Sequence, residues 1–144
     1  MKKYVKISLI YAIAALACGV FYREFTKFNE YTAKTALAVT HLHLFVLGTV
    51  LFLIVAVFCM LTDAEKQKTF KPFFIVYNIG LPFLTATFLV RGILQVTGAE
   101  LSSAVNGMIS GIAGISHAVM AAGIVLLFIA LLKSKPLKRK NGEE

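Results

Sequence analysis

Four long apolar stretches, separated by short charged segments, are the feature that most constrains this chain. They cover roughly residues 7–22, 35–61, 72–96 and 101–132, and a helix needs about 20 apolar residues to cross a bilayer. The sequence is 58% hydrophobic, which exceeds the usual share for a soluble domain. We therefore predict an all-α fold, a polytopic membrane protein whose four-transmembrane-helix bundle occupies residues 1–133. Its helices are expected at about 5–22, 31–62, 72–97 and 102–133.

The segments outside these stretches carry further expectations. The first stretch also looks like a secretory signal peptide, with Ala15-Leu16-Ala17-Cys18-Gly19 similar to an imperfect cleavage site, but we expect a retained helix. Residues 23–35 mix charges with aromatic side chains, as is typical of a membrane interface. We expect an interfacial helix there, or an outward extension of the second helix. Residues 134–144 are predicted to be a basic, disordered tail.

Basic residues are distributed unequally between the two sides of such a bundle. With four helices both termini share one side, which collects eleven Lys and Arg residues: Lys2, Lys3, Lys6, Lys66, Lys68, Lys71, Lys133, Lys135, Lys138, Arg139 and Lys140. The other side collects four: Arg23, Lys27, Lys34 and Arg91. The positive-inside rule predicts a multi-pass cell-membrane protein with both termini in the cytoplasm. Topology and lipid headgroups account for the net charge of +8, so we expect the bilayer as a partner and no nucleic acid.

All three histidines of the chain lie inside apolar stretches, where ionisable groups are rare without a function. His41 and His43 are two residues apart, so on a regular helix they point about 200° apart. That divergence disfavours a zinc or copper site that uses all three histidines. Gly48 shares the helix face of His41, and Gly114 lies near the face of His117, among small residues that leave room for a flat ligand.

One histidine from each of two facing helices is a usual way for a helical bundle to hold a heme iron. We predict a heme b with His117 as one ligand and His41 or His43 as the other. Depth along the helices favours His43, whereas the space beside Gly48 favours His41. Arg91 could bind a heme propionate through two hydrogen bonds, or extend to the outer headgroups.

Several motifs carry a resemblance to known families. The segment His41-Leu42-His43-Leu44-Phe45-Val46-Leu47-Gly48 resembles the His-x-His…Gly signature of membrane heme-and-copper proteins of the nitric oxide response. It is also similar to the second helix of the catalytic subunits of heme-copper oxidases and nitric oxide reductases. This resemblance implies that His41 and His117 ligate a b-type heme. The further histidines of a copper centre and a His-Tyr pair are missing, which puts dioxygen or nitric oxide reduction in doubt.

The whole chain looks more like a family of small four-helix bacterial membrane proteins of unknown function. The motifs that carry this resemblance are the His-x-His pair, Tyr77-Asn78-Ile79-Gly80-Leu81, Arg91-Gly92 and Gly111-Ile112-Ala113-Gly114-Ile115-Ser116-His117. It implies a bacterial inner-membrane protein but no particular activity.

The leading functional expectation is a heme b-binding, cytochrome-like membrane protein for electron transfer, redox or gas sensing, or heme handling. A homodimer and a redox partner in the membrane are expected with it. One alternative is a carrier or channel for a metal ion or small molecule, lined by Asn78, Arg91 and Glu100. Another is an assembly subunit of a larger complex without its own cofactor. No nucleophile–base arrangement stands out, so we predict no catalytic residues.

Overall fold

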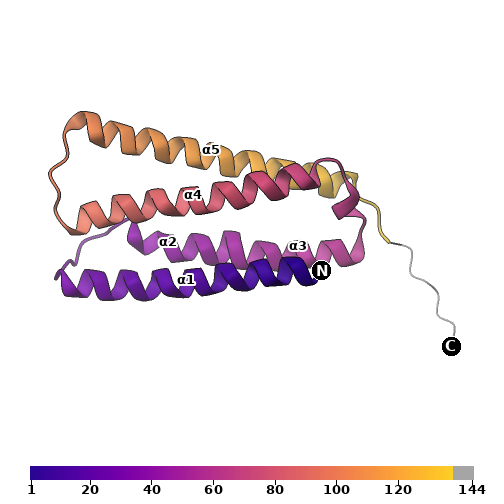
Figure 1. Cartoon of the computed structure of the whole chain (residues 1–144), viewed down its shortest axis with the longest axis horizontal. Coiled ribbons are helices and arrows are strands. Elements are labelled where there is room, and N and C mark those ends of the chain that lie inside the picture. Colours follow the sequence, from indigo (N-terminus) through magenta and orange to yellow (C-terminus); the bar gives the residue numbers. More distant parts are fainter. Residues whose placement is uncertain (138–144) are drawn as a thin grey trace.

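The computed structural model describes residues 1–137 as four long helical segments that run alternately up and down (Figure 1). α1 spans Lys2–Phe28, α4 spans Phe70–Val96 and α5 spans Ser103–Lys133. The second segment joins α2 (Leu37–His43), the π-helical η1 (Leu44–Val50) and α3 (Leu51–Leu61) without a break. A short 3₁₀ turn, η2 (Ala64–Lys66), precedes α4. The predicted all-α fold is confirmed, and each of the four segments is long and apolar enough to cross a membrane.

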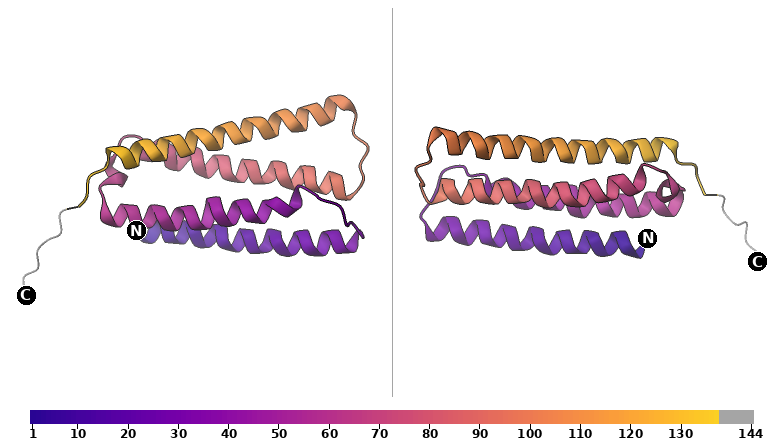
Figure 2. Two further views of the ribbon diagram at one scale, coloured as in Figure 1. Left: turned by 180° about the vertical axis from the view of Figure 1, so that it is seen from behind. Right: turned by 45° about the horizontal axis from the view of Figure 1, so that its top comes forward.

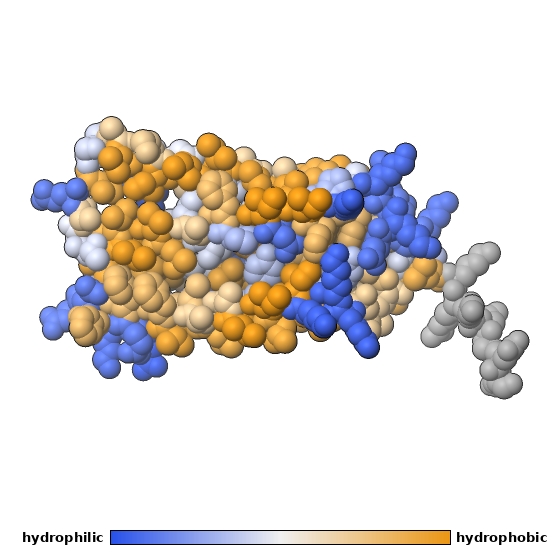
Figure 3. Space-filling model, viewed as in Figure 1, coloured by the Kyte–Doolittle hydropathy of each residue, from blue (hydrophilic) through white to orange (hydrophobic). Residues whose placement is uncertain are grey.

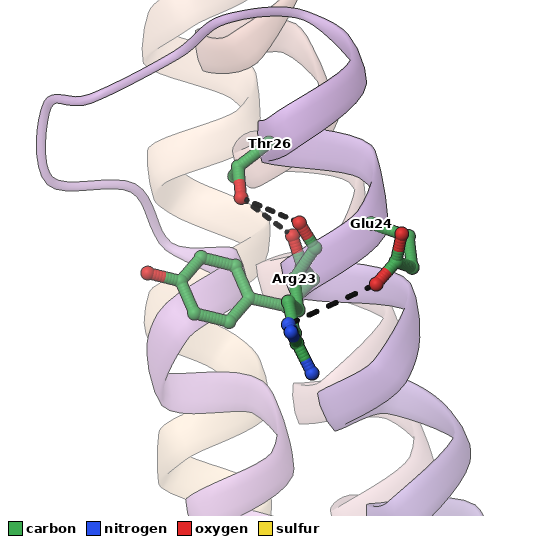
Figure 4. Close-up of polar contacts among 4 residues, drawn as sticks. Arg23, Glu24 and Thr26 are labelled. Carbon is green, nitrogen blue, oxygen red and sulfur yellow. Dashed lines mark hydrogen bonds and ion pairs between the residues drawn. The ribbon is translucent and has the colours of Figure 1, made fainter.

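The first helix is longer than the sequence predicted, and the second begins later. Residues 23–28 continue α1, so they form neither a separate interfacial helix nor an extension of the second one. Thr26 donates its hydroxyl hydrogen to the carbonyls of Tyr22 and Arg23, and the Arg23 guanidinium lies 3.8 Å from the Glu24 carboxylate (Figure 4). The chain leaves the helix at Glu30, whose φ is 51°. Charged side chains are compatible with a helix that protrudes from the hydrocarbon, which is why hydropathy alone ended α1 too early.

The π-helical η1 interrupts the regular hydrogen bonding of the second segment in the middle of the bundle. Tyr77 of α4 donates its hydroxyl hydrogen to the Leu47 carbonyl at 2.8 Å, and Ser8 of α1 donates to the Thr49 carbonyl at 2.8 Å. A carbonyl without a partner is costly in hydrocarbon. The two neighbouring helices therefore supply the donors that stabilise this irregular turn.

Aromatic side chains form the core of the bundle. Phe52 and Tyr77 have centroids 5.8 Å apart, Phe52 and Phe73 have centroids 6.4 Å apart, and all three side chains are fully buried. The Tyr11 ring stacks on Phe52 at 5.7 Å from α1. α1 packs along α2, η1 and α3, while α4 contacts α2 on one side and α5 on another (Figures 1 and 2). α4 therefore packs between the second helical segment and α5.

The end of the molecule that holds both Met1 and Leu137 is called here the termini end, and the opposite end the far end (Figure 1). At the termini end, Asp63 and Lys135 bond twice, through the Asp63 N–H to the Lys135 carbonyl at 3.0 Å and through the Lys135 N–H to the Asp63 carboxylate at 2.6 Å. The Leu137 N–H donates to the Leu61 carbonyl at 2.9 Å. Residues 134–137 therefore pair with the turn after α3, contrary to the predicted disordered tail. The remainder of that predicted tail, 138–144, lies outside the described residues.

The outside of the bundle is apolar across its middle. Hydrophobic side chains cover most of the visible face between its two ends, and hydrophilic side chains gather at the ends (Figure 3). Large apolar side chains are exposed on all four segments, among them Ile10, Leu53, Ile79 and Ile115. Such a surface is suited to lipid rather than water. The protein is a transmembrane helical bundle.

Candidate functional site

His43 and His117 both contact one aromatic side chain, that of Phe88. The His43 ring lies edge-on to the Phe88 ring with centroids 4.8 Å apart, and the His117 ring does the same at 5.8 Å. The three residues come from α2, α5 and α4, so the arrangement depends on tertiary packing. The structure therefore brings one helix-two histidine and the helix-five histidine to one place.

The two histidines share the same hydrogen-bonding arrangement. His43 Nδ1 lies 2.8 Å from the Val39 carbonyl, and His117 Nδ1 lies 2.8 Å from the Ala113 carbonyl. A carbonyl oxygen can only accept, so Nδ1 carries the hydrogen in both rings. In a neutral ring the lone pair is then on Nε2. Histidines that bind metals in proteins commonly hold one nitrogen in this way and use the other as the ligand.

An apolar groove lies on the termini side of this pair. It holds a cavity of about 350 Å³ between η1 and α3 on one side and α5 on the other. Val46 and Val50 lie one and two turns along the face of His43, and Ile124 and Phe128 lie two and three turns along the face of His117. The full lining consists of Val46, Leu47, Val50, Leu51, Ile54, Val55, Phe58, Ile124, Leu127, Phe128 and Leu131. Neither His43 nor His117 is among these residues, so the apolar groove begins beyond the histidine pair.

His41 faces a different neighbour. Its ring stacks on Tyr22 of α1 with centroids 6.2 Å apart, and it lies beside Gly19, where an added Cβ would come within 3.7 Å of the imidazole. His41 Nδ1 is buried without a hydrogen-bond partner. The structure does not bring His41 to His117, because α2 turns its His41 face toward α1 and its His43 face toward α4.

The two glycines singled out in the sequence have different surroundings. A Cβ at Gly48 would come within 2.5 Å of the Tyr11 side chain, so Gly48 allows α1 to pack closely against η1 and does not leave space for a flat ligand. A Cβ at Gly114 would meet nothing within 4 Å. Gly114 precedes His117 by almost one turn, so this side of the histidine is open.

Arg91 lies almost one turn beyond Phe88 on α4, in the direction of the far end. Its half-buried side chain lines a cavity of about 260 Å³ between α4 and α5. Asn78 is engaged inside the bundle, where its carbonyl oxygen accepts from Tyr11 at 3.0 Å and its amide donates to the Phe74 carbonyl at 2.7 Å. Glu100 is exposed in the turn between α4 and α5. Of these three side chains, only Arg91 lines the polar cavity between α4 and α5.

Within residues 1–137, no group of three or more His, Cys, Asp or Glu side chains comes together. Two histidines are enough for a heme, because the porphyrin supplies the other four iron ligands. Phe88 was not foreseen from the sequence as a member of the site. The available signal was its place on α4, two turns after Leu81 and one turn before Gly92, which are both buried. Phe88 could be predicted as part of the site only with the knowledge that this face of α4 contacts α2.

Comparison with known proteins identifies one family. The family model described as a protein of unknown function (DUF2871) matches residues 1–134. No curated protein and no solved structure matches the chain. The match agrees with the expected family of unknown function, and it shows no resemblance to heme-copper proteins.

Proposed function

The chain belongs to the family described as a protein of unknown function (DUF2871), and we propose that it is a membrane protein that binds a heme b through His43 and His117. One observation carries the proposal. Two intramembrane histidines on different helices meet at Phe88, and each has its Nδ1 hydrogen bonded to a carbonyl of its own helix. Nε2 of each neutral ring is then available as an iron ligand.

The residues around the pair fit such a cofactor. The groove beside them is lined by apolar side chains, which suits the body of a porphyrin, and Gly114 leaves the α5 side open. The Phe88 ring contacts both imidazoles, so we propose that this ring moves when the heme binds. His43 replaces His41 as the helix-two ligand we favour, because the ring of His41 stacks on Tyr22 instead.

A heme held by His43 and His117 would supply one-electron redox chemistry and would leave no iron position for a gas. We therefore propose electron transfer with a redox partner in the membrane, ahead of gas sensing or heme handling. The bilayer orientation is part of the proposal. The eleven basic residues on the side of the termini against four on the other indicate that the termini face the cytoplasm of a bacterial inner-membrane protein.

The test is an absorbance spectrum of the purified protein before and after reduction, from cells supplied with heme. We compare the wild type with His43→Ala, His117→Ala and His41→Ala. The last variant is a matched control, since it removes an intramembrane histidine two residues from His43 that faces α1. We expect a sharp reduced α-band in the wild type and in His41→Ala, and its loss in the other two.

Two results contradict the proposal. A colourless wild-type protein after heme supply excludes a resident heme. Loss of the band in His41→Ala with retention in His43→Ala identifies the other helix-two histidine as the ligand, as the resemblance to oxidase subunits implied. Circular dichroism of each variant separates loss of heme from loss of fold.

A further inference from the structure

α4 and α5 enclose an opening that widens toward the far end. The two helices are close at the termini end and separate toward the turn that joins them (Figures 1 and 2). All of residues 103–115 on α5 are exposed or only partly buried, and an added Cβ at Gly107 or Gly111 would meet nothing within 4 Å. Two adjoining cavities lie in this opening, one polar and one apolar.

The polar cavity, of about 260 Å³, is rich in hydrogen-bond donors. Its lining consists of Arg91, Leu94, Gln95, Ala99, Leu101, Asn106 and Ile109. The Gln95 carbonyl oxygen already accepts from the Ala36 N–H at 2.7 Å, which leaves its amide hydrogens as donors. The ion pair found within residues 1–137 joins Arg23 to Glu24, so Arg91 has no carboxylate partner there. Guanidinium and amide donors together suit the oxygens of an anion.

The apolar cavity, of about 200 Å³, continues from the polar one. Ile109 borders both, and the apolar slot is lined by Phe83, Ala86, Thr87, Val90, Ile109 and Ile112. Thr87 does not make the slot polar, because its hydroxyl donates to the Leu84 carbonyl at 2.7 Å. Val90 and Phe88 are two residues apart on α4 and so point about 200° apart. The slot therefore opens away from the histidine pair.

We propose that this opening binds an anionic phospholipid, with its phosphate at Arg91 and one acyl chain in the slot between α4 and α5. Because the Arg91 guanidinium has no carboxylate partner within residues 1–137, it favours an anionic lipid headgroup. The apolar slot favours an acyl chain attached to that headgroup. The depth also agrees, since Arg91 lies less than two turns from the end of α4, near the level of headgroups. This inference does not depend on heme binding, because the slot and Phe88, which contacts both histidines, lie on different faces of α4.

The test is native mass spectrometry of the full chain in neutral detergent, titrated with phosphatidylglycerol. Phosphatidylcholine and inorganic phosphate form parallel arms. The variants are Arg91→Ala, which removes the charge, and Ala86→Phe, which fills the slot without touching the charge. Lys34→Ala is the matched control, since it removes a far-end cation that does not line either cavity. Heme content is measured on the same samples.

We expect one tightly held phosphatidylglycerol in the wild type, with weaker retention of phosphatidylcholine and no displacement by inorganic phosphate. Arg91→Ala should weaken binding by roughly ten-fold or more, as expected for a lost charged hydrogen bond, and Ala86→Phe should weaken it as well. Lys34→Ala should stay within about two-fold of the wild type. Equal phosphatidylglycerol binding in all four proteins overturns the proposal, and so does displacement by inorganic phosphate. A loss of heme in Arg91→Ala with lipid binding unchanged would instead assign Arg91 to a heme propionate.

Discussion

Tyr77 and Leu47 are joined by a 2.8 Å hydrogen bond in which the tyrosine hydroxyl donates to a carbonyl inside the π-helical turn. The tyrosine side chain is fully buried, so no water replaces the donor when it is removed. Tyr77→Phe should therefore lower the free energy of unfolding by about 1–2 kcal/mol. Thermal unfolding in detergent measures this. Tyr31→Phe, whose hydroxyl makes a 3.4 Å contact in an exposed loop, should change little, and an equal effect of both variants would contradict the role assigned to the π-helical carbonyl.

Close helix approach at Gly48 leads to a second prediction. Gly48→Ala places a Cβ within 2.5 Å of Tyr11, so α1 must shift, and we expect a loss of about 1–3 kcal/mol in unfolding free energy. Gly111→Ala adds the same methyl group where nothing lies within 4 Å. It should be neutral or slightly stabilising, by up to about 1 kcal/mol. The pair is compared by midpoint of thermal unfolding, and a more harmful change at Gly111 would show that α5 has a close partner there.

Phe88 should obstruct heme uptake, because its ring packs against both imidazoles. Phe88→Ala is expected to speed heme incorporation into the heme-free protein and to lower its unfolding free energy by about 1–3 kcal/mol, less than for a fully buried phenylalanine. Stopped-flow absorbance after heme addition measures the rate. Phe45→Ala, which removes an exposed ring of η1, should leave that rate unchanged. Slower uptake in Phe88→Ala would mean that Phe88 supports the site instead.

The pairing of residues 134–137 with the turn after α3 can be tested by truncation. Ending the chain after Ser134 removes both bonds between Asp63 and Lys135, whereas ending it after Leu137 keeps them. We expect hydrogen exchange at the Asp63 amide to rise about ten-fold only in the shorter protein, because a net hydrogen bond or two is lost. Equal exchange in the two proteins would show that this pairing does not protect the turn.

Hydropathy predicted the number and class of helices, since bilayer thickness fixes the length of an apolar run. It could not predict that α1 continues to Phe28, because charged residues beyond the hydrocarbon are compatible with either helix or loop. Hydropathy also could not predict the π-helical turn, since the hydroxyls that bond its carbonyls, those of Ser8 and Tyr77, come from other helices.

The candidate site was predictable in part. Helical periodicity predicted that His41 and His43 point apart, and the structure agrees, because one contacts Tyr22 and the other Phe88. Which of the two histidines comes near His117 depends on how the helices pack against one another. The residue pattern of a single helix does not carry that information. Gly48 was misinterpreted for the same reason, since a glycine that admits a ligand and one that admits a tyrosine look alike in sequence.

The uneven support of α5 has a mechanical consequence. Its buried residues, Ser116, Met120, Gly123, Leu127 and Ala130, all lie from Ser116 onward toward the termini end, and none lies between Ser103 and Ile115. The helix is therefore held by packing along one part of its length, like a beam fixed at one end. His117 follows Ser116, at the point where the packed part of α5 meets the part that has no buried residue. A small tilt of α5 at this point would produce a displacement that grows along the helix toward Ser103. A tilt of α5 at His117 would therefore displace the turn between α4 and α5 more than the residues packed near the termini end.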